Sequence, residues 1–141
     1  MLFCLRGKGG RGILLSDHVN SNKQGNVGVG RAIAYFTAQG YTVSVPLTDS
    51  QEYDLVIDQD GALKRVQIKT TYYKRNGVYT VNLKTSTKRK NKNIYKGFDS
   101  TKCDLLYILT EKDEEYIIPC KGLTVETSLN LSDKYSEYKI S

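Results

Sequence analysis

The dipeptide Asp60-Gly61 constrains the fold of this chain more than any other feature of its sequence. It separates two runs of strand-forming residues, 53–58 and 64–70. An Asp-Gly pair between two such runs is typical of an antiparallel hairpin that is closed by a two-residue turn. One face of this hairpin collects apolar side chains and is predicted to lie in the core; these are Tyr53, Leu55, Ile57, Val66 and Ile68.

The opposite face of the hairpin gathers polar side chains. With the turn formed as expected, Asp54 faces Gln67 and Lys69 faces Glu52. Residues that pair directly across two strands place their side chains on the same face of the sheet. The hairpin is therefore predicted to hold a carboxylate, an amide and an ammonium group in one small patch.

A helix is predicted before the hairpin, and further strands are predicted around it. The helix is expected to begin near Asn26 and to end before Gly40, with one apolar face along its length. The run 104–109 is nearly continuously apolar, as in strands that are buried on both faces. Other strands are expected at 41–45, 78–84 and 116–119, and a loop at 85–97. This order predicts a mixed α/β or α+β fold.

The composition fits a single globular domain. The chain has 141 residues, of which 39% are hydrophobic and 26% are charged. Its three cysteines are widely spaced and form no zinc pattern. No run reaches the length of a membrane span, so no membrane partner is expected and a cytoplasmic location is the default. Residues 1–23 are Gly-rich at their centre and are predicted to form a flexible or irregular extension, and residues 24–141 the domain.

The positive charge of the chain is concentrated in its middle third. The net charge is +6, and residues 61–98 hold eleven Lys and Arg with no Asp or Glu. Such a block indicates a polyanionic partner, with nucleic acid as the first candidate. The alternative is a solvated surface segment. The block begins inside the strand that carries Gln67 and Lys69, which favours the functional interpretation.

The polar patch on the hairpin suits phosphodiester chemistry. A divalent metal ion needs hard oxygen ligands, which Asp54, the amide of Gln67 and the backbone carbonyl of Ile68 can supply. Lys69 can orient or deprotonate a water molecule and can counter charge on a phosphate. The alternative is an ordinary solvent-facing strand pair, because an Asp followed by a distant Gln-x-Lys is a weak pattern alone.

Several segments carry a resemblance to a known superfamily; they are residues 25–28, 32–36, 40–46, 53–58 and 65–70. Through them the chain resembles the PD-(D/E)xK nucleases, and in particular the small branch that includes group I intron-associated homing endonucleases. The resemblance implies a restriction-endonuclease-like core, with a central mixed sheet flanked by helices. It also implies hydrolysis of DNA phosphodiester bonds that depends on Mg²⁺, for which Mn²⁺ substitutes.

The resemblance also assigns roles to residues. Asp54 matches the acid of the motif, Lys69 matches its lysine, and Gln67 stands where most members have Glu or Asp. Many members place a Glu on the first helix, and the nearest equivalent here is Val29, which cannot bind a metal ion. Asp54 is then the only strong anionic ligand, and metal affinity is expected to be low without DNA.

The basic block supplies the candidate DNA contacts: Lys74, Arg75, Lys88, Arg89, Lys90, Lys92 and Lys96. Such cations give affinity for phosphate and little sequence information. Asn91 and Asn93 can read base edges if their loop enters a groove. Tyr72 and Tyr73 either flank the DNA backbone or pack partly buried, and packing is the commoner role.

The predicted function is that of a metal-dependent DNA endonuclease that resembles the homing endonucleases. A dimer or tetramer is expected, because double-strand cleavage needs two active sites. Two alternatives remain open on the sequence alone. One is a DNA-binding protein without nuclease activity, and the other is a nuclease resembling the Holliday-junction resolvases.

Overall fold

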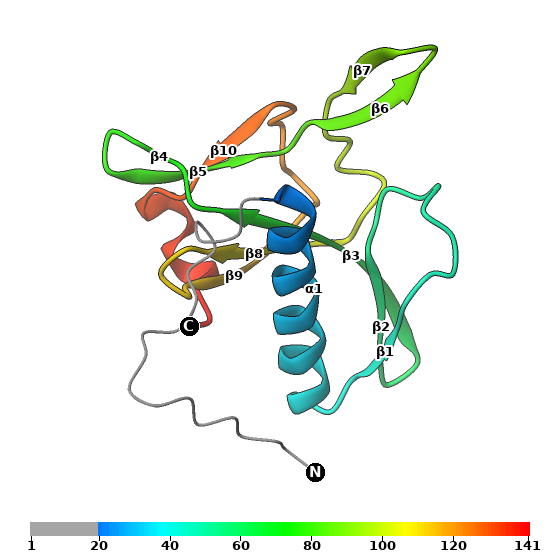
Figure 1. Ribbon diagram of the computed structural model, residues 1–141. Coiled ribbons are helices and arrows are strands. Elements are labelled where there is room, and N and C mark those ends of the chain that lie inside the picture. The colour runs from blue at the N-terminus through cyan, green and yellow to red at the C-terminus, as the bar shows by residue number, and fades with distance from the viewer. Residues whose placement is uncertain (1–19) are drawn as a thin grey trace, which may run out of the picture.

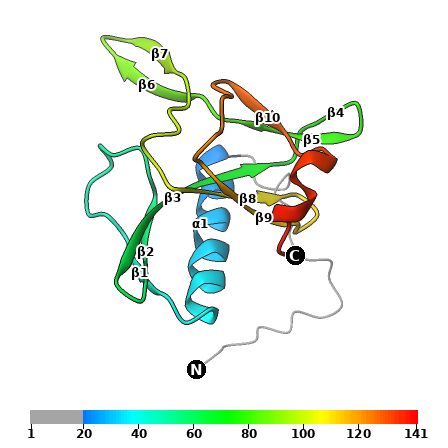
Figure 2. The same ribbon diagram turned by 180° about the vertical axis from the view of Figure 1, so that it is seen from behind.

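The fold is a five-stranded mixed sheet covered by a helix on one face and by a smaller sheet on the other. The computed structural model describes residues 20–141, and most of the predicted extension falls outside them. The strand order is β1-β2-β3-β8-β9, and only the β3–β8 pair is parallel. Figures 1 and 2 show α1 on the front of this sheet, and β10 and η2 behind it. The predicted central mixed sheet is confirmed, and within residues 20–141 the α-helix that flanks it is α1.

The elements of the described chain run from α1 to η2, with β-strands between them. They are α1 (Ser21–Ala38), β1 (Thr42–Ser44), β2 (Leu55–Gln59), β3 (Ala62–Thr71), β4 (Lys74–Arg75), β5 (Val78–Asn82), β6 (Thr85–Arg89), β7 (Lys92–Lys96), β8 (Leu105–Thr110), β9 (Glu115–Pro119), β10 (Ser128–Asn130) and the 3₁₀-helix η2 (Asp133–Tyr138). The strands β10, β5 and β4 form the smaller sheet, and β6 and β7 pair only with each other.

The predicted β2–β3 hairpin is confirmed. Asp60 and Gly61 form its turn with φ of 53° and 89°, as a type I′ turn requires. The ladder runs from Gln59 opposite Ala62 to Leu55 opposite Val66. The predicted core side chains Leu55, Ile57, Val66 and Ile68 are all buried.

Helix α1 begins earlier than the sequence indicated. Asn20 is the N-cap residue, and its side chain accepts a hydrogen bond from the backbone N–H of Asn22 at 2.8 Å. Asn26, the predicted start, lies in the second turn, and the first turn includes residues assigned to the extension. The end at Gly40 is confirmed, because Gly40 has a φ of 85° and its N–H donates to the carbonyl of Thr37 at 2.9 Å.

The helix approaches β3 most closely at a glycine. The buried positions of α1 are Gly28, Ala32 and Phe36, which recur at helical spacing on one face. A Cβ on Gly28 would lie 2.6 Å from Cγ2 of Thr70 and 3.2 Å from Cγ2 of Ile68. The glycine therefore sets how closely the helix approaches the strand.

Strand β8 is buried on both faces, as its apolar sequence predicted. Tyr107 and Leu109 pack with α1 and β2 in one hydrophobic cluster. Leu106 and Ile108 pack with β5, β10 and η2 in the other. The central strands β3 and β8 are thus enclosed by two cores, which fixes the positions of residues at the strand ends.

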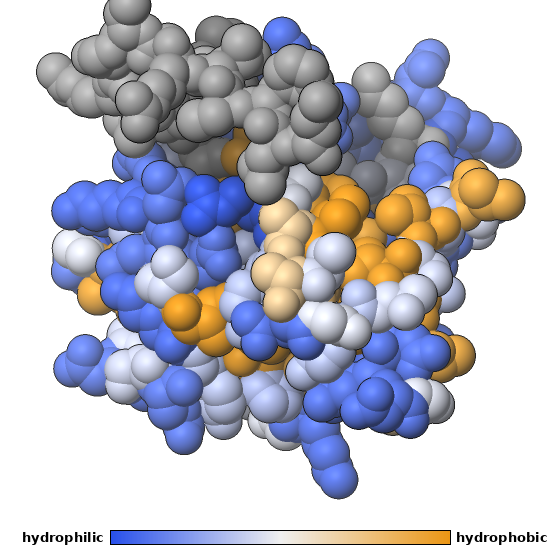
Figure 3. Space-filling view, turned by 90° about the horizontal axis from the view of Figure 1, so that it is seen from below, coloured by the Kyte–Doolittle hydropathy of each residue, from blue (hydrophilic) through white to orange (hydrophobic). Residues whose placement is uncertain are grey.

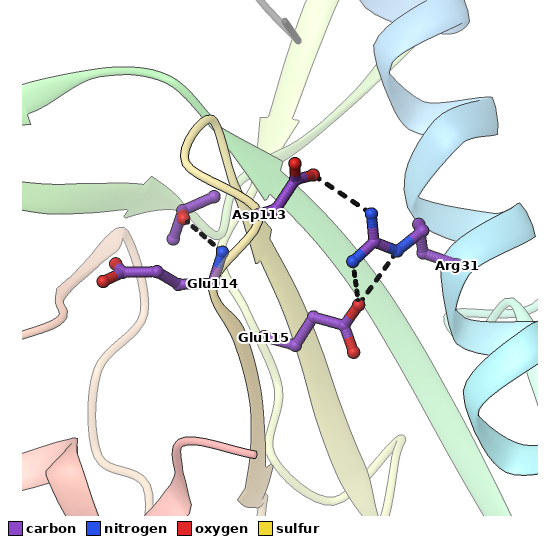
Figure 4. Close-up of polar contacts among 5 residues, drawn as sticks. Arg31, Asp113, Glu114 and Glu115 are labelled. Carbon is purple, nitrogen blue, oxygen red and sulfur yellow. Dashed lines mark hydrogen bonds and ion pairs between the residues drawn. The ribbon is translucent and has the colours of Figure 1, made fainter. Parts of the chain in front are cut away.

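An ion pair holds α1 against the β8–β9 hairpin (Figure 4). The Nη2 atom of Arg31 lies 2.5 Å from Oε1 of Glu115, and its Nη1 atom lies 3.0 Å from Oδ1 of Asp113. Glu115 is almost fully buried, whereas Asp113 is exposed. A buried carboxylate without a partner is costly, so this contact fixes the position of the helix above the sheet.

The segment 85–97, predicted as a loop, is largely an antiparallel ribbon. Strands β6 and β7 pair from Thr85 opposite Lys96 to Arg89 opposite Lys92. The prediction failed because no residue of the turn is glycine and the strands lack apolar alternation. This ribbon, residues 85–96, projects from the rest of the domain in Figures 1 and 2.

The surface seen from below in Figure 3 is mostly hydrophilic, with apolar side chains gathered toward the side on which Figure 1 draws β1 and β2. Val45, Leu47 and Leu63, near these strands, are among the exposed large apolar residues. Within the described residues, no helix is both long enough and apolar enough to cross a membrane.

Replacing Gly28 with Ala is expected to destabilise the fold by about 1–2 kcal/mol, because overpacking against Thr70 outweighs the gain in helix propensity. Gly30→Ala is the matched control, since a Cβ there meets nothing within 4 Å. It should stabilise the protein by up to about 1 kcal/mol. Chemical denaturation measures both values. Thr70→Ser removes the obstructing methyl group and should restore most of the loss in the double variant, whereas equal effects of Gly28→Ala and Gly30→Ala would contradict this packing.

Candidate active site

Asp54 lies where β2 leaves its pairing with β3. Its backbone N–H donates to the carbonyl of Val66 at 2.8 Å, one residue out of step with the ladder that ends at Leu55 and Val66. The Oδ2 atom of Asp54 accepts a hydrogen bond from the backbone N–H of Ile68 at 2.6 Å. The Asp54 carboxylate therefore accepts the hydrogen bond that a backbone carbonyl would accept if β2 continued. Its Oδ1 atom is left for other partners.

This one-residue offset in the hydrogen bonding changes which residues lie opposite one another across the hairpin. Gln67 does not pair with Asp54; it lies beside Leu106 of β8, on the sheet face away from α1. Glu52 contacts Nζ of Lys96 on the ribbon and not Lys69. The expected direct partners were wrong because the regular ladder stops one residue before Asp54.

A pocket of about 390 Å³ opens between Asp54 and the first turns of α1. The residues that line it are Ser21, Asn22, Gly25, Asn26, Val29, Asp54, Ile68, Lys69 and Thr70. Three of the predicted site residues, Asp54, Ile68 and Lys69, are thus brought together, whereas Gln67 is outside this lining. Val29 also lines the pocket, at the position where the resemblance expected a helix residue to face the site.

Sequence reasoning missed the contribution of two asparagines. Asn22, Asn26 and Val29 recur at the spacing of one helix face, and all three line the pocket. Asn26 was interpreted as a helix cap, so its side chain was not considered for the site. The helical spacing of Asn22, Asn26 and Val29 can be read from the sequence, and it is the signal that could have placed both asparagines at the site.

Burial shifts the ionisation of the two charged groups in opposite directions. It raises the pKa of the Asp54 carboxyl, an effect partly offset by the hydrogen bond from Ile68 and the charge of Lys69. It lowers the pKa of the Lys69 ammonium, partly offset by the Asp54 carboxylate. Opposite shifts of a carboxyl and an amine that share one pocket are typical of catalytic sites.

The donor atoms at the pocket fit a hard divalent cation. The N–H and C=O groups of one strand residue point the same way, so Ile68, which donates to Asp54, also turns its carbonyl to that side. Carboxylate, carbonyl and amide oxygens are the ligands that Mg²⁺ and Mn²⁺ prefer. Within residues 20–141, however, no group of three or more His, Cys, Asp or Glu side chains lies together. The oxygen atoms at this pocket are therefore of the type that binds a divalent cation, but only one of the groups, the Asp54 carboxylate, carries negative charge.

A second hollow continues the pocket along β3. It shares Ser21 and Thr70 with the first pocket, has a volume of about 620 Å³, and extends to Tyr72, Tyr73 and Lys84. Tyr72 and Tyr73 are 51% and 59% exposed, so the commoner packing role does not apply to them. Together the two hollows form a trough that passes the beginning of α1.

The basic block is divided between two hairpins. Lys74 and Arg75 lie on β4, at the opposite end of the domain from the ribbon (Figure 1). The ribbon carries the remaining predicted contacts, Lys88, Arg89, Lys90, Lys92 and Lys96. Nζ of Lys74 lies 4.5 Å from the ring centre of Tyr79, and Lys96 is paired with Glu52. The other ribbon cations have no acidic neighbour in sequence.

The chain belongs to the PD-(D/E)XK endonuclease family, whose model matches residues 19–139. No curated protein is detectably similar in sequence. The sequence-based resemblance to this family is confirmed.

A solved structure supports the same fold. The chain is similar to a bacterial homing endonuclease, I-Ssp6803I, with a TM-score of 0.71 and 22% sequence identity. The match covers 85% of this chain and 88% of that one. At this level of identity the similarity establishes the fold, and it bears out the predicted restriction-endonuclease-like core.

Replacing Asp54 with Asn should lower the pKa of Lys69 further, because the carboxylate is the group that holds this pKa up against burial. The amide oxygen of Asn can still accept the hydrogen bond from Ile68, so the backbone should stay in place. An NMR titration of protein with ¹³C-labelled lysine side chains measures the change. Asp58→Asn serves as the control, since Asp58 accepts its hydrogen bond from Gly61 in the turn. A Lys69 titration that is identical in both variants would contradict the proximity of Asp54 and Lys69.

Proposed function

We propose that this chain is a divalent-metal-dependent DNA endonuclease that hydrolyses phosphodiester bonds in the pocket formed by Asp54 and Lys69. The observation that carries the proposal is that Asp54 and Lys69 line one pocket, where burial raises the pKa of the carboxyl and lowers that of the amine. Membership of an endonuclease family supports DNA as the substrate.

The oxygen atoms around Asp54 would hold Mg²⁺, for which Mn²⁺ substitutes. Asp54 supplies the negative charge and the carbonyl of Ile68 supplies a second oxygen. Gln67 lies next to Ile68 on β3 and would contribute its amide oxygen after a side-chain movement, because it is half-buried outside the pocket lining. A metal ion bound there would polarise the phosphate and lower the pKa of a water ligand. With one charged ligand, affinity should depend on DNA phosphate.

Lys69 would act on the water and on the phosphate. Burial lowers its pKa, which makes the ammonium easier to deprotonate, and the neutral amine can accept a proton from the attacking water. In its protonated form it counters the negative charge that develops on the phosphate oxygens. Burial on the strand β3 keeps the amine oriented without loop movement.

The trough along β3 offers a path for the DNA backbone. It runs from Asp54 past the N-terminus of α1 to Tyr72 and Tyr73. The N-terminus of a helix favours phosphate, and exposed tyrosines can contact sugar or phosphate. The β4–β5 hairpin and the ribbon, at opposite ends of the domain, carry the side chains to which we assign further DNA phosphate contacts: Lys74, Arg75, Lys88, Arg89, Lys90, Lys92 and Lys96.

Cleavage of both strands would require a homo-oligomer, a dimer or a tetramer, because double-strand cleavage needs two active sites and residues 20–141 form one pocket of this kind. The exposed apolar residues Val45, Leu47 and Leu63 near β1 and β2 offer surface for contact between copies. The likeness to a homing endonuclease supports a homing-endonuclease-like role.

A second candidate function is DNA binding without cleavage. It is favoured by Val29, which lines the pocket where an acid would strengthen metal binding, and by the absence of an acidic cluster among residues 20–141. This candidate predicts salt-dependent DNA binding that survives Asp54→Ala, with no cleavage in Mg²⁺ or Mn²⁺.

Incubation of the purified protein with supercoiled plasmid DNA tests the proposal. Nicking or linearisation should require Mg²⁺ or Mn²⁺ and should stop when EDTA removes the metal. Lys69→Ala and Asp54→Ala should each lower the cleavage rate by about 10²–10⁴-fold, the range for a catalytic acid, base or electrostatic group. Lys134→Ala, on η2, is the control for loss of one positive charge. Equal cleavage rates for the wild type and Lys69→Ala would refute the assignment.

A further inference from the structure

The ribbon is anchored firmly at its base. Leu83 precedes β6 and Phe98 follows β7, and both side chains are buried in the core behind the sheet. The N–H of Leu83 donates to the carbonyl of Thr127 at 3.0 Å, and the N–H of Phe98 donates to the carbonyl of Glu126 at 2.8 Å. Both ends of the ribbon are therefore fixed to the same short segment.

Beyond this base the ribbon is tied to the rest of the domain by the ion pair of Lys96 with Glu52. Every residue of β7 is exposed, including Ile94 and Tyr95 at 49% and 66%. An isolated two-stranded ribbon is marginally stable at best, and burial of apolar surface does not account for this one. An extension fixed at the base and bare along its length is suited to contact another molecule.

The turn of the ribbon differs from the other two-residue hairpin turns among residues 20–141. The β2–β3 and β4–β5 turns are Asp60-Gly61 and Asn76-Gly77, and all four residues have positive φ. The β6–β7 turn has Lys90 and Asn91 at φ of 47° and 59°, with no glycine. A lysine in this left-handed region is strained, so the residue type here is not explained by turn formation. It places an additional positive charge at the tip.

The dimensions of the ribbon match one groove of duplex DNA. Two paired strands lie about 5 Å apart, and strands of five residues extend about 17 Å, taking about 3.3 Å per residue. The major groove of B-DNA is about 12 Å wide and 8.5 Å deep and admits a two-stranded ribbon, whereas the minor groove is about 6 Å wide. The sequence 85–96 holds five cations and no acid, which complements the phosphates on both sides of a groove.

One face of the ribbon lies on the side of the segment that precedes Asp54. Paired residues share a face, so Thr87, Arg89, Lys92 and Ile94 lie on the same side as Lys96. Lys96 contacts Glu52, two residues before Asp54. This face therefore lies on the side of the Asp54 loop. It combines a guanidinium group, which suits guanine, with methyl groups, which suit the methyl of thymine.

We infer that the ribbon enters the major groove of double-stranded DNA beside the cleavage position and reads base edges with the face that holds Thr87, Arg89, Lys92 and Ile94. Lys90 at the tip contacts phosphate. The inference rests on the proposed function in one respect, that duplex DNA is the partner. It assigns discrimination between DNA sequences to the ribbon and not to the pocket on β3.

Binding measurements without a divalent metal separate this inference from catalysis. Fluorescence anisotropy would follow the affinity of the protein for a random-sequence duplex at several KCl concentrations. Arg89→Ala/Lys92→Ala should reduce the slope of log K against log [KCl] by about 1.8, at about 0.9 for each lost phosphate contact, or by less where Arg89 contacts a base. Lys121→Ala/Lys134→Ala, the control pair outside the ribbon, should leave the slope unchanged. Equal slopes for the two double variants would overturn the inference and leave the proposed nuclease intact.

The Lys90→Gly variant excludes a merely structural effect. It relieves the strained turn, so the melting temperature should stay the same or rise while duplex affinity falls by a few-fold. Methyl green, which occupies the major groove, should compete with the wild type, and netropsin, which occupies the minor groove, should not. The inference would be overturned if Lys90→Gly bound duplex DNA as tightly as the wild type, or if netropsin alone competed for binding. Equal affinity for duplex RNA would also overturn it, because the deep major groove of RNA is too narrow for the ribbon. Absence of any duplex binding by the wild type would refute the proposed function as well.

Discussion

The close approach of α1 to β3 at Gly28 is the contact on which the rest of the site depends. It lets the methyl groups of Ile68 and Thr70 lie directly against the helix backbone, and it brings the face with Asn22, Asn26 and Val29 over the end of β2. A bulkier residue at this point would lift the helix off the strand. The pocket would then lose one wall, although none of its polar residues had changed.

The site and the ribbon differ in the physical basis of their positions. Lys69 is carried by β3, which lies between the two cores, and the Asp54 carboxylate is bonded to the Ile68 N–H of the same strand. The buried Glu115 with Arg31 fixes the helix above them. These contacts favour precise geometry at the expense of burying charge, which is why the pKa values of both groups are displaced. The ribbon is held at its base and by the ion pair of Lys96 with Glu52, so its exposed faces are free to fit a partner. The rigid centre suits cleavage and the projecting, charged ribbon suits contact with DNA, so the two tasks of such an enzyme fall to different parts of the fold.

Much of this arrangement could be predicted from the sequence, because its signals are local. The Asp60-Gly61 turn fixed the pairing of β2 and β3, the glycine after α1 marked its end, and the apolar run of β8 indicated burial on both faces. The start of α1 was misplaced because Asn20 and Asn26 are equally good capping residues. The ribbon was missed because its turn is Lys90-Asn91 and its strands bury nothing. The one-residue offset at Asp54 depends on a hydrogen bond to Ile68 and on the parallel β3–β8 pairing, and neither has a local signature.

The most direct test of the proposed site is anomalous X-ray scattering from Mn²⁺ in crystals of the protein bound to duplex DNA. The Lys69→Ala variant would keep the DNA uncut while Asp54 and Ile68 remain unchanged. The account predicts an Mn²⁺ peak about 2.0–2.4 Å from the Asp54 carboxylate and from the Ile68 carbonyl, with a phosphate oxygen as a further ligand. A metal ion bound elsewhere on the chain, with Asp54 contacting only the Ile68 N–H, would contradict it.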